Sequence, residues 1–171
     1  AQISRQYKKG YTETAEALAL TSIAIFDGFI SCWDEKYRSS YVRPVTVINE
    51  LIDKNWLPLL QTPPFPEYTS GHSTITASAA TVLTKLYGEN FAFEDSSDYH
   101  YIGLKRKFNS FQAAAAEASM SRVYGGIHYV LSVNTGSEQG KKVGVPVFEK
   151  VDEGRIISEL KISNLPENGK T

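Results

Sequence analysis

The chain has 171 residues, a length that usually folds as a single domain. Its hydrophobic content of 42% and charged content of 22% are ordinary for a soluble globular domain, which excludes wholesale disorder. The formal net charge of -1 provides no basic field for a nucleic acid, and the single cysteine, Cys32, excludes an intrachain disulfide framework and a multi-cysteine zinc site.

The first predicted element is a long helix that begins after Thr12, a suitable N-cap residue. Residues at spacings of three and four predict one buried stripe along it. This stripe comprises Ala15, Leu18, Ala19, Ser22, Ile25, Phe26, Phe29 and Trp33. The helix should end before Arg43, because a residue that precedes a proline avoids the helical conformation. No segment is expected to span a membrane, since the longest uncharged apolar run, residues 17–26, is far shorter than the ~20 residues required.

A second, short helix is predicted from Pro44, a good first-turn residue, to about Ile52. Residues 55–70 contain four prolines and predict a structured loop, and a loop of this length in a compact domain is usually functional or disordered. Helical character returns from Gly71 to Tyr87, and Gly88 stands at the stop position.

Residues 94–109 are polar and mixed, which predicts a loop. Ser110 can cap an alanine-rich helix from Phe111 to Tyr124, and Gly125 and Gly126 then break it. A last helix is predicted from about His128 to Val143.

From Val145 to Thr171 the sequence has scattered β-branched residues, prolines and glycines, which predict an irregular tail with a short strand pair. The expected fold class is all-α, a helical bundle with a Pro-rich active-site loop. Residues 1–144 are expected to form the helical catalytic domain, and residues 145–171 the C-terminal tail.

Three short segments combine charged or histidine side chains with a break in the predicted helices: residues 36–44, 63–73 and 121–128. They supply three cations, Lys36, Arg43 and Arg122, in a chain that is otherwise near neutral. Arginine forks match tetrahedral oxyanions bidentately, and lysine adds a point charge. Taken singly, these cations would be interpreted as solvated helix faces or helix ends, so only their joint occurrence indicates an oxyanion site.

The second segment also places Ser70 and Gly71 immediately before a predicted helix, where backbone N–H groups can bind an anion. His72 and His128 then provide a pair in which one ring attacks or ligates a central atom and the other moves a proton. Such a pocket suits phosphoryl transfer, which depends on positioning and charge stabilisation. The spacing of the histidines does not match a set of metal ligands, so no zinc site is expected.

The patterns KxxxxxxRP from Lys36, SGH from Ser70 and SRxxxxxH from Ser121 resemble the three-part signature of the type 2 phosphatidic acid phosphatase and vanadium haloperoxidase superfamily. The phrase PPFPEYTSGHS is more similar to the soluble haloperoxidase-related branch. The resemblance implies an all-α fold and phosphate or vanadate binding by Lys36, Arg43, Ser70, Gly71, Arg122 and His128. It also implies that His128 is the nucleophile or the axial vanadium ligand, and that His72 is the general acid.

The sequence departs from this pattern at Ser132, where the family usually has an aspartate that orients the last histidine. A serine supplies no counter-charge, which puts the nucleophilicity of His128 in question. Ser132 is therefore treated as the orienting position.

Three functions follow from this resemblance. The first is a phosphate-monoester hydrolase of the acid phosphatase type, with no cofactor. The second is a vanadate-dependent haloperoxidase on the same residues, acting on halide and peroxide with vanadate as cofactor. The third is an oxyanion-binding module with little turnover, motivated by Ser132. The expected partner is a small molecule, a phosphate ester or halide with peroxide, and not a nucleic acid; the oligomeric state stays open. Analogy with exported relatives implies a periplasmic or secreted location.

Overall fold

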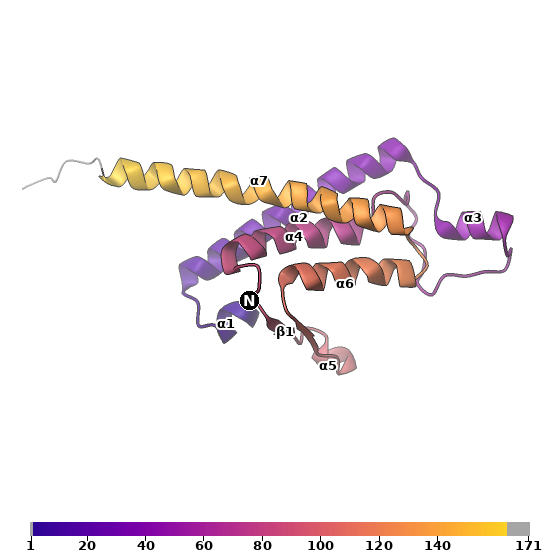
Figure 1. Ribbon diagram of the computed structural model, residues 1–171, viewed down its shortest axis with the longest axis horizontal. Helices are drawn as coiled ribbons and strands as arrows, with labels where there is room; N and C mark the ends of the chain where they lie inside the picture. The colour runs from indigo at the N-terminus through magenta and orange to yellow at the C-terminus, as the bar shows by residue number, and fades with distance from the viewer. Residues whose placement is uncertain (1, 164–171) are drawn as a thin grey trace, which may run out of the picture.

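The computed structural model describes residues 2–163 and is built almost entirely from helices (Figure 1). In chain order the elements are α1 (Gln2–Gln6), α2 (Tyr11–Ser39), α3 (Pro44–Leu51), α4 (Gly71–Tyr87), β1 (Phe93–Asp95), α5 (Tyr99–Ile102), β2 (Arg106–Phe108), α6 (Phe111–Tyr124) and α7 (Val130–Ser163). The all-α helical bundle expected from the sequence is confirmed.

Helix α4 is the centre of the bundle and contacts α2, α6 and α7. Its buried side chains are mostly small, among them Ser73, Ala77, Ser78 and Ala80. Small side chains let neighbouring backbones approach closely, so α4 can be covered on several faces at once. Its predicted bounds are confirmed, and Ser70 caps its first turn by accepting a hydrogen bond from the Ser73 N–H.

Helix α2 packs on α4 through a different face from the one predicted. The buried residues, spaced by three or four, are Ala17, Leu20, Ala24, Gly28, Cys32 and Lys36. The predicted stripe is wrong: Phe26 is 63% exposed, and Leu18, Ile25 and Phe29 are also exposed. Close packing on α4 selects small side chains for the contact, so these bulky apolar residues lie outside the buried face. The helix also begins at Tyr11, two residues earlier than predicted, with Gly10 as its N-cap.

Three glycines on α7 set how closely it packs on α4. Gly136, Gly140 and Gly144 are spaced by four, so they form one face of the helix. A Cβ at Gly140 would overlap with the carbonyl oxygen of Thr74, and one at Gly144 would lie 2.7 Å from the carbonyl oxygen of Ser78. This contact aligns the N-terminus of α4 with the segment that enters α7.

The irregular tail predicted from Val145 is wrong for the described residues, because α7 continues through Pro146 to Ser163. A proline inside a helix removes one backbone hydrogen bond. Val147 offsets this loss by burial beside Leu20, Ala24 and Val82. Residues 164–171 lie outside the described part, and the division of the chain after residue 144, which falls inside α7, stays a prediction.

The strand pair lies elsewhere, in the segment predicted as a polar loop. Strands β1 and β2 pair antiparallel with Phe93 opposite Phe108, and their rings lie 5.5 Å apart. The cross-strand aromatic pair supports a ladder of only three residues, which is too short to give a periodic pattern in the sequence.

One 18-residue window within residues 11–51 is apolar enough and poor enough in charge to cross a membrane, by length and composition alone. The core helix of a soluble protein passes the same test, and in this chain one face of α2 packs on α4. The expectation that no segment spans a membrane therefore stays a prediction.

Candidate active site

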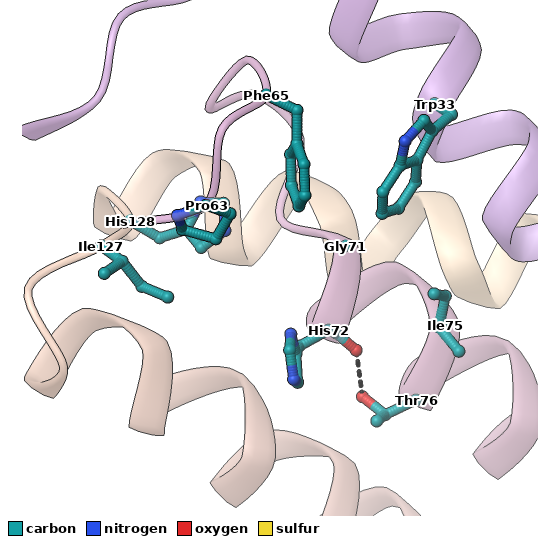
Figure 2. A pocket seen from close by; sticks show the side chains of 9 residues that line it. All are labelled: Trp33, Pro63, Phe65, Gly71, His72, Ile75, Thr76, Ile127 and His128. Carbon is teal, nitrogen blue, oxygen red and sulfur yellow. Dashed lines mark hydrogen bonds between the residues drawn. The ribbon is translucent and has the colours of Figure 1, made fainter. Parts of the chain in front are cut away.

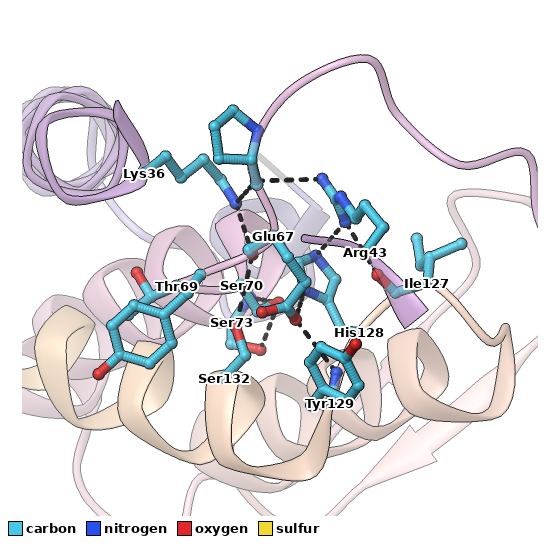
Figure 3. Close-up of polar contacts among 12 residues, drawn as sticks. Lys36, Arg43, Glu67, Thr69, Ser70, Ser73, Ile127, His128, Tyr129 and Ser132 are labelled. Atoms are coloured by element: carbon cyan, nitrogen blue, oxygen red, sulfur yellow. Dashed lines mark hydrogen bonds and ion pairs between the residues drawn. The ribbon is translucent and has the colours of Figure 1, made fainter. Parts of the chain in front are cut away.

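The three predicted segments converge at one end of the bundle (Figure 3). Lys36 stands near the end of α2, Arg43 is the N-cap of α3, and Ser70 is the N-cap of α4. Arg122 lies in the last turn of α6, and His128 lies in the short link to α7. The loop at residues 52–70 closes over them, so a Pro-rich loop between two helices forms one wall of the site.

Lys36 is fully buried and forms hydrogen bonds with the backbone of this loop. Its Nζ donates to the carbonyl oxygens of Pro66 at 3.0 Å and Glu67 at 2.9 Å. The ammonium also lies 5.7 Å from the Trp33 ring centroid and 5.3 Å from that of Phe65. Burial lowers the pKa of Lys36 to about 8. The charge of this lysine therefore depends on pH within the physiological range.

Arg43 connects the loop to the histidine segment. Its Nε donates to the Phe65 carbonyl oxygen at 3.1 Å, and its Nη1 donates to the Ile127 carbonyl oxygen at 2.9 Å. The same Nη1 lies 3.2 Å from Nε2 of His128. Because a guanidinium only donates, Nε2 must accept, which makes the His128 ring neutral with its proton on Nδ1.

Gly71 and His72 open helix α4 beside the site. Gly71 is buried, and a Cβ there would lie 3.2 Å from the Trp33 ring, so a residue with a side chain would crowd the loop. His72 Nε2 lies 3.5 Å from Nη1 of Arg122. Partial burial, and then the charge of Arg122, lower the pKa of His72. A neutral His72 can accept a proton at this wall of the pocket.

Sequence reasoning missed Glu67, which contacts His128 directly. Its Oε1 accepts from Nδ1 of His128 at 2.6 Å and from the Tyr129 N–H at 3.1 Å. Ser132, predicted as the orienting residue, instead donates to the carbonyl oxygen of Glu67 at 3.4 Å. Burial lowers the pKa of His128, while the hydrogen bond to Glu67 opposes that shift. One signal could have found Glu67: it is the only acidic residue in the sequence between Asp53 and Glu89.

A cavity of about 260 Å³ opens onto this cluster (Figure 2). Its lining is mainly apolar and comprises Trp33, Pro63, Phe65, Gly71, His72, Ile75, Thr76, Ile127 and His128. The two histidines lie on its wall, so a molecule in the cavity reaches both rings.

The site carries positive charge that no carboxylate neutralises through an ion pair. Within the described residues, no carboxylate oxygen lies within 4.0 Å of a charged nitrogen of Lys36, Arg43 or Arg122. Arg122 instead donates through Nε to the Ser121 hydroxyl at 3.0 Å. Three cations without a direct carboxylate partner, beside a helix N-terminus, fit a bound oxyanion, so this donor set suits phosphate or vanadate.

Comparison with known proteins agrees with this geometry. The family model described as the VCPO second helical-bundle domain matches residues 16–55 and 50–155. A solved structure described as the first bacterial vanadium-dependent iodoperoxidase is 50% identical, with a TM-score of 0.83, over 86% of this chain. Holo and apo forms of a bacterial vanadium-dependent chloroperoxidase are each 20% identical, with a TM-score of 0.67 over 78% of this chain, which supports the fold alone. No curated protein matched this chain.

The chain spans about a third of each solved relative: 36% of the iodoperoxidase, and 35% and 36% of the two chloroperoxidase chains. The family match, in contrast, extends over most of this chain. The predicted motifs and the helical fold agree with the match. The chain therefore belongs to the VCPO second helical-bundle family, in the haloperoxidase-related branch of the type 2 phosphatidic acid phosphatase and vanadium haloperoxidase superfamily.

Proposed function

We propose that this chain carries the vanadate site of a vanadium-dependent haloperoxidase. The observation that carries the proposal is the cluster of Lys36, Arg43 and Arg122 near His128, in which no cation forms an ion pair with a carboxylate of the described residues. The 50% identity to a structure described as an iodoperoxidase supports the same function, and favours it over the phosphatase reading.

Each residue has a defined part in this proposal. The three cations bind and neutralise the oxyanion oxygens, and the N-terminus of α4 adds the Ser70 hydroxyl and the Gly71 N–H as donors. His128 offers the lone pair of Nε2 as the ligand. His72, whose Nε2 accepts from Arg122, takes up or releases a proton at the pocket wall. When bound, vanadate would supply Lewis-acid activation of peroxide toward halide.

The apolar cavity favours iodide among the halides. An anion that enters a pocket lined by Trp33, Phe65 and Ile75 loses water, and this cost falls as the ion becomes larger. Iodide is the largest of the three common halides, so its desolvation costs least.

Oxidation of each halide by hydrogen peroxide, after loading with orthovanadate, tests this proposal. We expect iodide oxidation that exceeds bromide and chloride oxidation, and loss of all three in His128→Ala. Absence of vanadate-dependent oxidation of every halide would contradict the proposal.

The same residues could bind a phosphate ester, and hydrolysis of an aryl phosphate without vanadate would favour the phosphatase instead. The third function, a binding module with little turnover, was suggested by the lack of a carboxylate at Ser132. The contact between the Glu67 carboxylate and Nδ1 of His128 argues against it. A periplasmic or secreted location stays a prediction.

A further inference from the structure

Glu67 is a fully buried carboxylate in the loop that enters α4. Its Oε1 makes the 2.6 Å contact to Nδ1 of His128 and accepts from the Tyr129 N–H. Its Oε2 is buried and has no hydrogen-bond partner among the described residues. Both oxygens are therefore withdrawn from solvent, and one of them serves His128.

Both backbone polar groups of Glu67, its N–H and its carbonyl oxygen, form hydrogen bonds, and these fix the position of its Cα. Its N–H donates to the Tyr41 carbonyl oxygen at 2.9 Å. Its carbonyl oxygen accepts from Nζ of Lys36 at 2.9 Å and from the Ser132 hydroxyl at 3.4 Å. The two short contacts, from α2 and from the link to α3, hold the backbone of Glu67 in place, and the contact to Ser132 on α7 is the longest of the three. Lys36, Glu67 and Ser132 are drawn in Figure 3.

The two ring nitrogens of His128 face groups of opposite kind. Nδ1 faces the Glu67 carboxylate, and Nε2 faces the donor-only guanidinium of Arg43 at 3.2 Å. A proton on Nδ1 and a lone pair on Nε2 satisfy both neighbours at once. The opposite tautomer would set a lone pair against the carboxylate and an N–H against the guanidinium.

A structural role alone does not require a charge at this position. An amide oxygen would accept the same hydrogen bonds, without the desolvation cost of a buried carboxylate that has one unpaired oxygen. A negative charge beside Nδ1 is favourable when the histidine donates an electron pair through Nε2, because the ring then becomes more positive.

We propose that Glu67 is the positioning residue for His128: it fixes the Nδ1–H tautomer and strengthens Nε2 as a donor to the oxyanion centre. It supplies the counter-charge that Ser132, on the first turn of α7, does not carry. The proposal rests on the proposed function in one respect, that His128 binds the oxyanion through Nε2.

Glu67→Gln tests this role, because it keeps an acceptor and removes the charge. Ser132→Ala is the matched control, since it removes a contact to the same residue without altering the carboxylate. Calorimetric titration with orthovanadate should give about 10- to 100-fold weaker binding in Glu67→Gln, and near wild-type binding in Ser132→Ala. In the vanadate-free protein, NMR of ¹⁵N-labelled histidine should give a far-downfield Nδ1 proton for His128 that moves upfield in Glu67→Gln only.

Unchanged vanadate affinity together with an unchanged Nδ1 resonance in Glu67→Gln would overturn the proposal. Equal losses in Glu67→Gln and Ser132→Ala would also overturn it, because the effect would then come from the loop and not from the charge. If Glu67→Gln does not fold, Glu67→Asp, which withdraws the carboxylate by one methylene, takes its place with the same expectations. Failure of the wild-type chain to bind vanadate would contradict the proposed function, whereas the ring resonance would still decide the role of Glu67.

Discussion

At the scale of single residues, Lys36 has two properties that matter for the site. It fixes the loop through two carbonyl oxygens, and it offers a positive charge to an anion. The two properties differ in their response to pH, because the carbonyls accept from the amine in either state, whereas an oxyanion is attracted only by the ammonium.

The depressed pKa of Lys36, about 8, predicts a pH-dependent affinity for vanadate. Binding favours the protonated amine, and the protonated fraction of the free protein falls as pH rises through this pKa. The ratio of wild-type affinity to that of Lys36→Gln should therefore fall by up to about tenfold between pH 7 and pH 9. Calorimetric titration of both proteins across this range measures the ratio, in which the titration of vanadate itself cancels. A ratio that stays constant or rises would be inconsistent with a buried lysine of low pKa.

The motif residues could be predicted from the sequence, whereas the contact between Glu67 and His128 could not. Lys36, Arg43 and His128 stand at spacings that resemble the superfamily signature, so the sequence alone indicates them as candidates. Glu67 reaches His128 across 61 positions of sequence, through a loop without periodicity. A contact of this kind depends on how three helices orient a loop, which no local pattern encodes.

At the scale of elements, the contact between α4 and α7 positions the site. Gly136, the first glycine of the α7 face, lies against the N-cap of α4: a Cβ there would lie 2.9 Å from the Ser70 carbonyl oxygen. The Ser70 N–H donates in turn to the Ser132 carbonyl oxygen at 3.2 Å. Separation of the two helices would therefore move the N-terminus of α4 away from His128.

Gly140→Ala tests this packing. The added Cβ would overlap with the Thr74 carbonyl oxygen and lie 2.9 Å from the Ser78 nitrogen, both on α4. Overpacking of this kind costs about 1–3 kcal/mol, which should outweigh the gain of up to about 1 kcal/mol in helix propensity. Gly154→Ala is the control on the same helix, because a Cβ there meets nothing within 4 Å. Urea unfolding should give a lower free energy of unfolding for Gly140→Ala and an equal or higher one for Gly154→Ala; the reverse order would contradict the packing described.

The starts of α4 and α6 were easier to predict than the buried face of α2. Ser110 caps α6 as expected, and α4 begins at Gly71 as expected, because helix starts depend on a few neighbouring residues. The buried face of α2 was predicted from hydrophobicity, whereas the fold selects small residues such as Ala24 and Gly28. Hydrophobicity therefore misleads where the partner backbone lies close.

At the scale of the whole molecule, bound vanadate should stabilise the folded chain. Lys36, Arg43 and Arg122 come from three helices or their caps, and an oxyanion between them would relieve their mutual repulsion. A ligand that binds only the folded state at 100 times its Kd adds about 2.7 kcal/mol to stability. For a chain of this size, that corresponds to a rise in Tm of roughly 5–10 °C.

The most direct test of the central claim, that His128 and the three cations form a vanadate site, is thermal unfolding of the wild type and His128→Ala with and without orthovanadate. We predict a rise in Tm of roughly 5–10 °C at saturating vanadate for the wild type. His128→Ala should give a much smaller rise at the same concentration. No rise in the wild type, or an equal rise in both proteins, would contradict the claim.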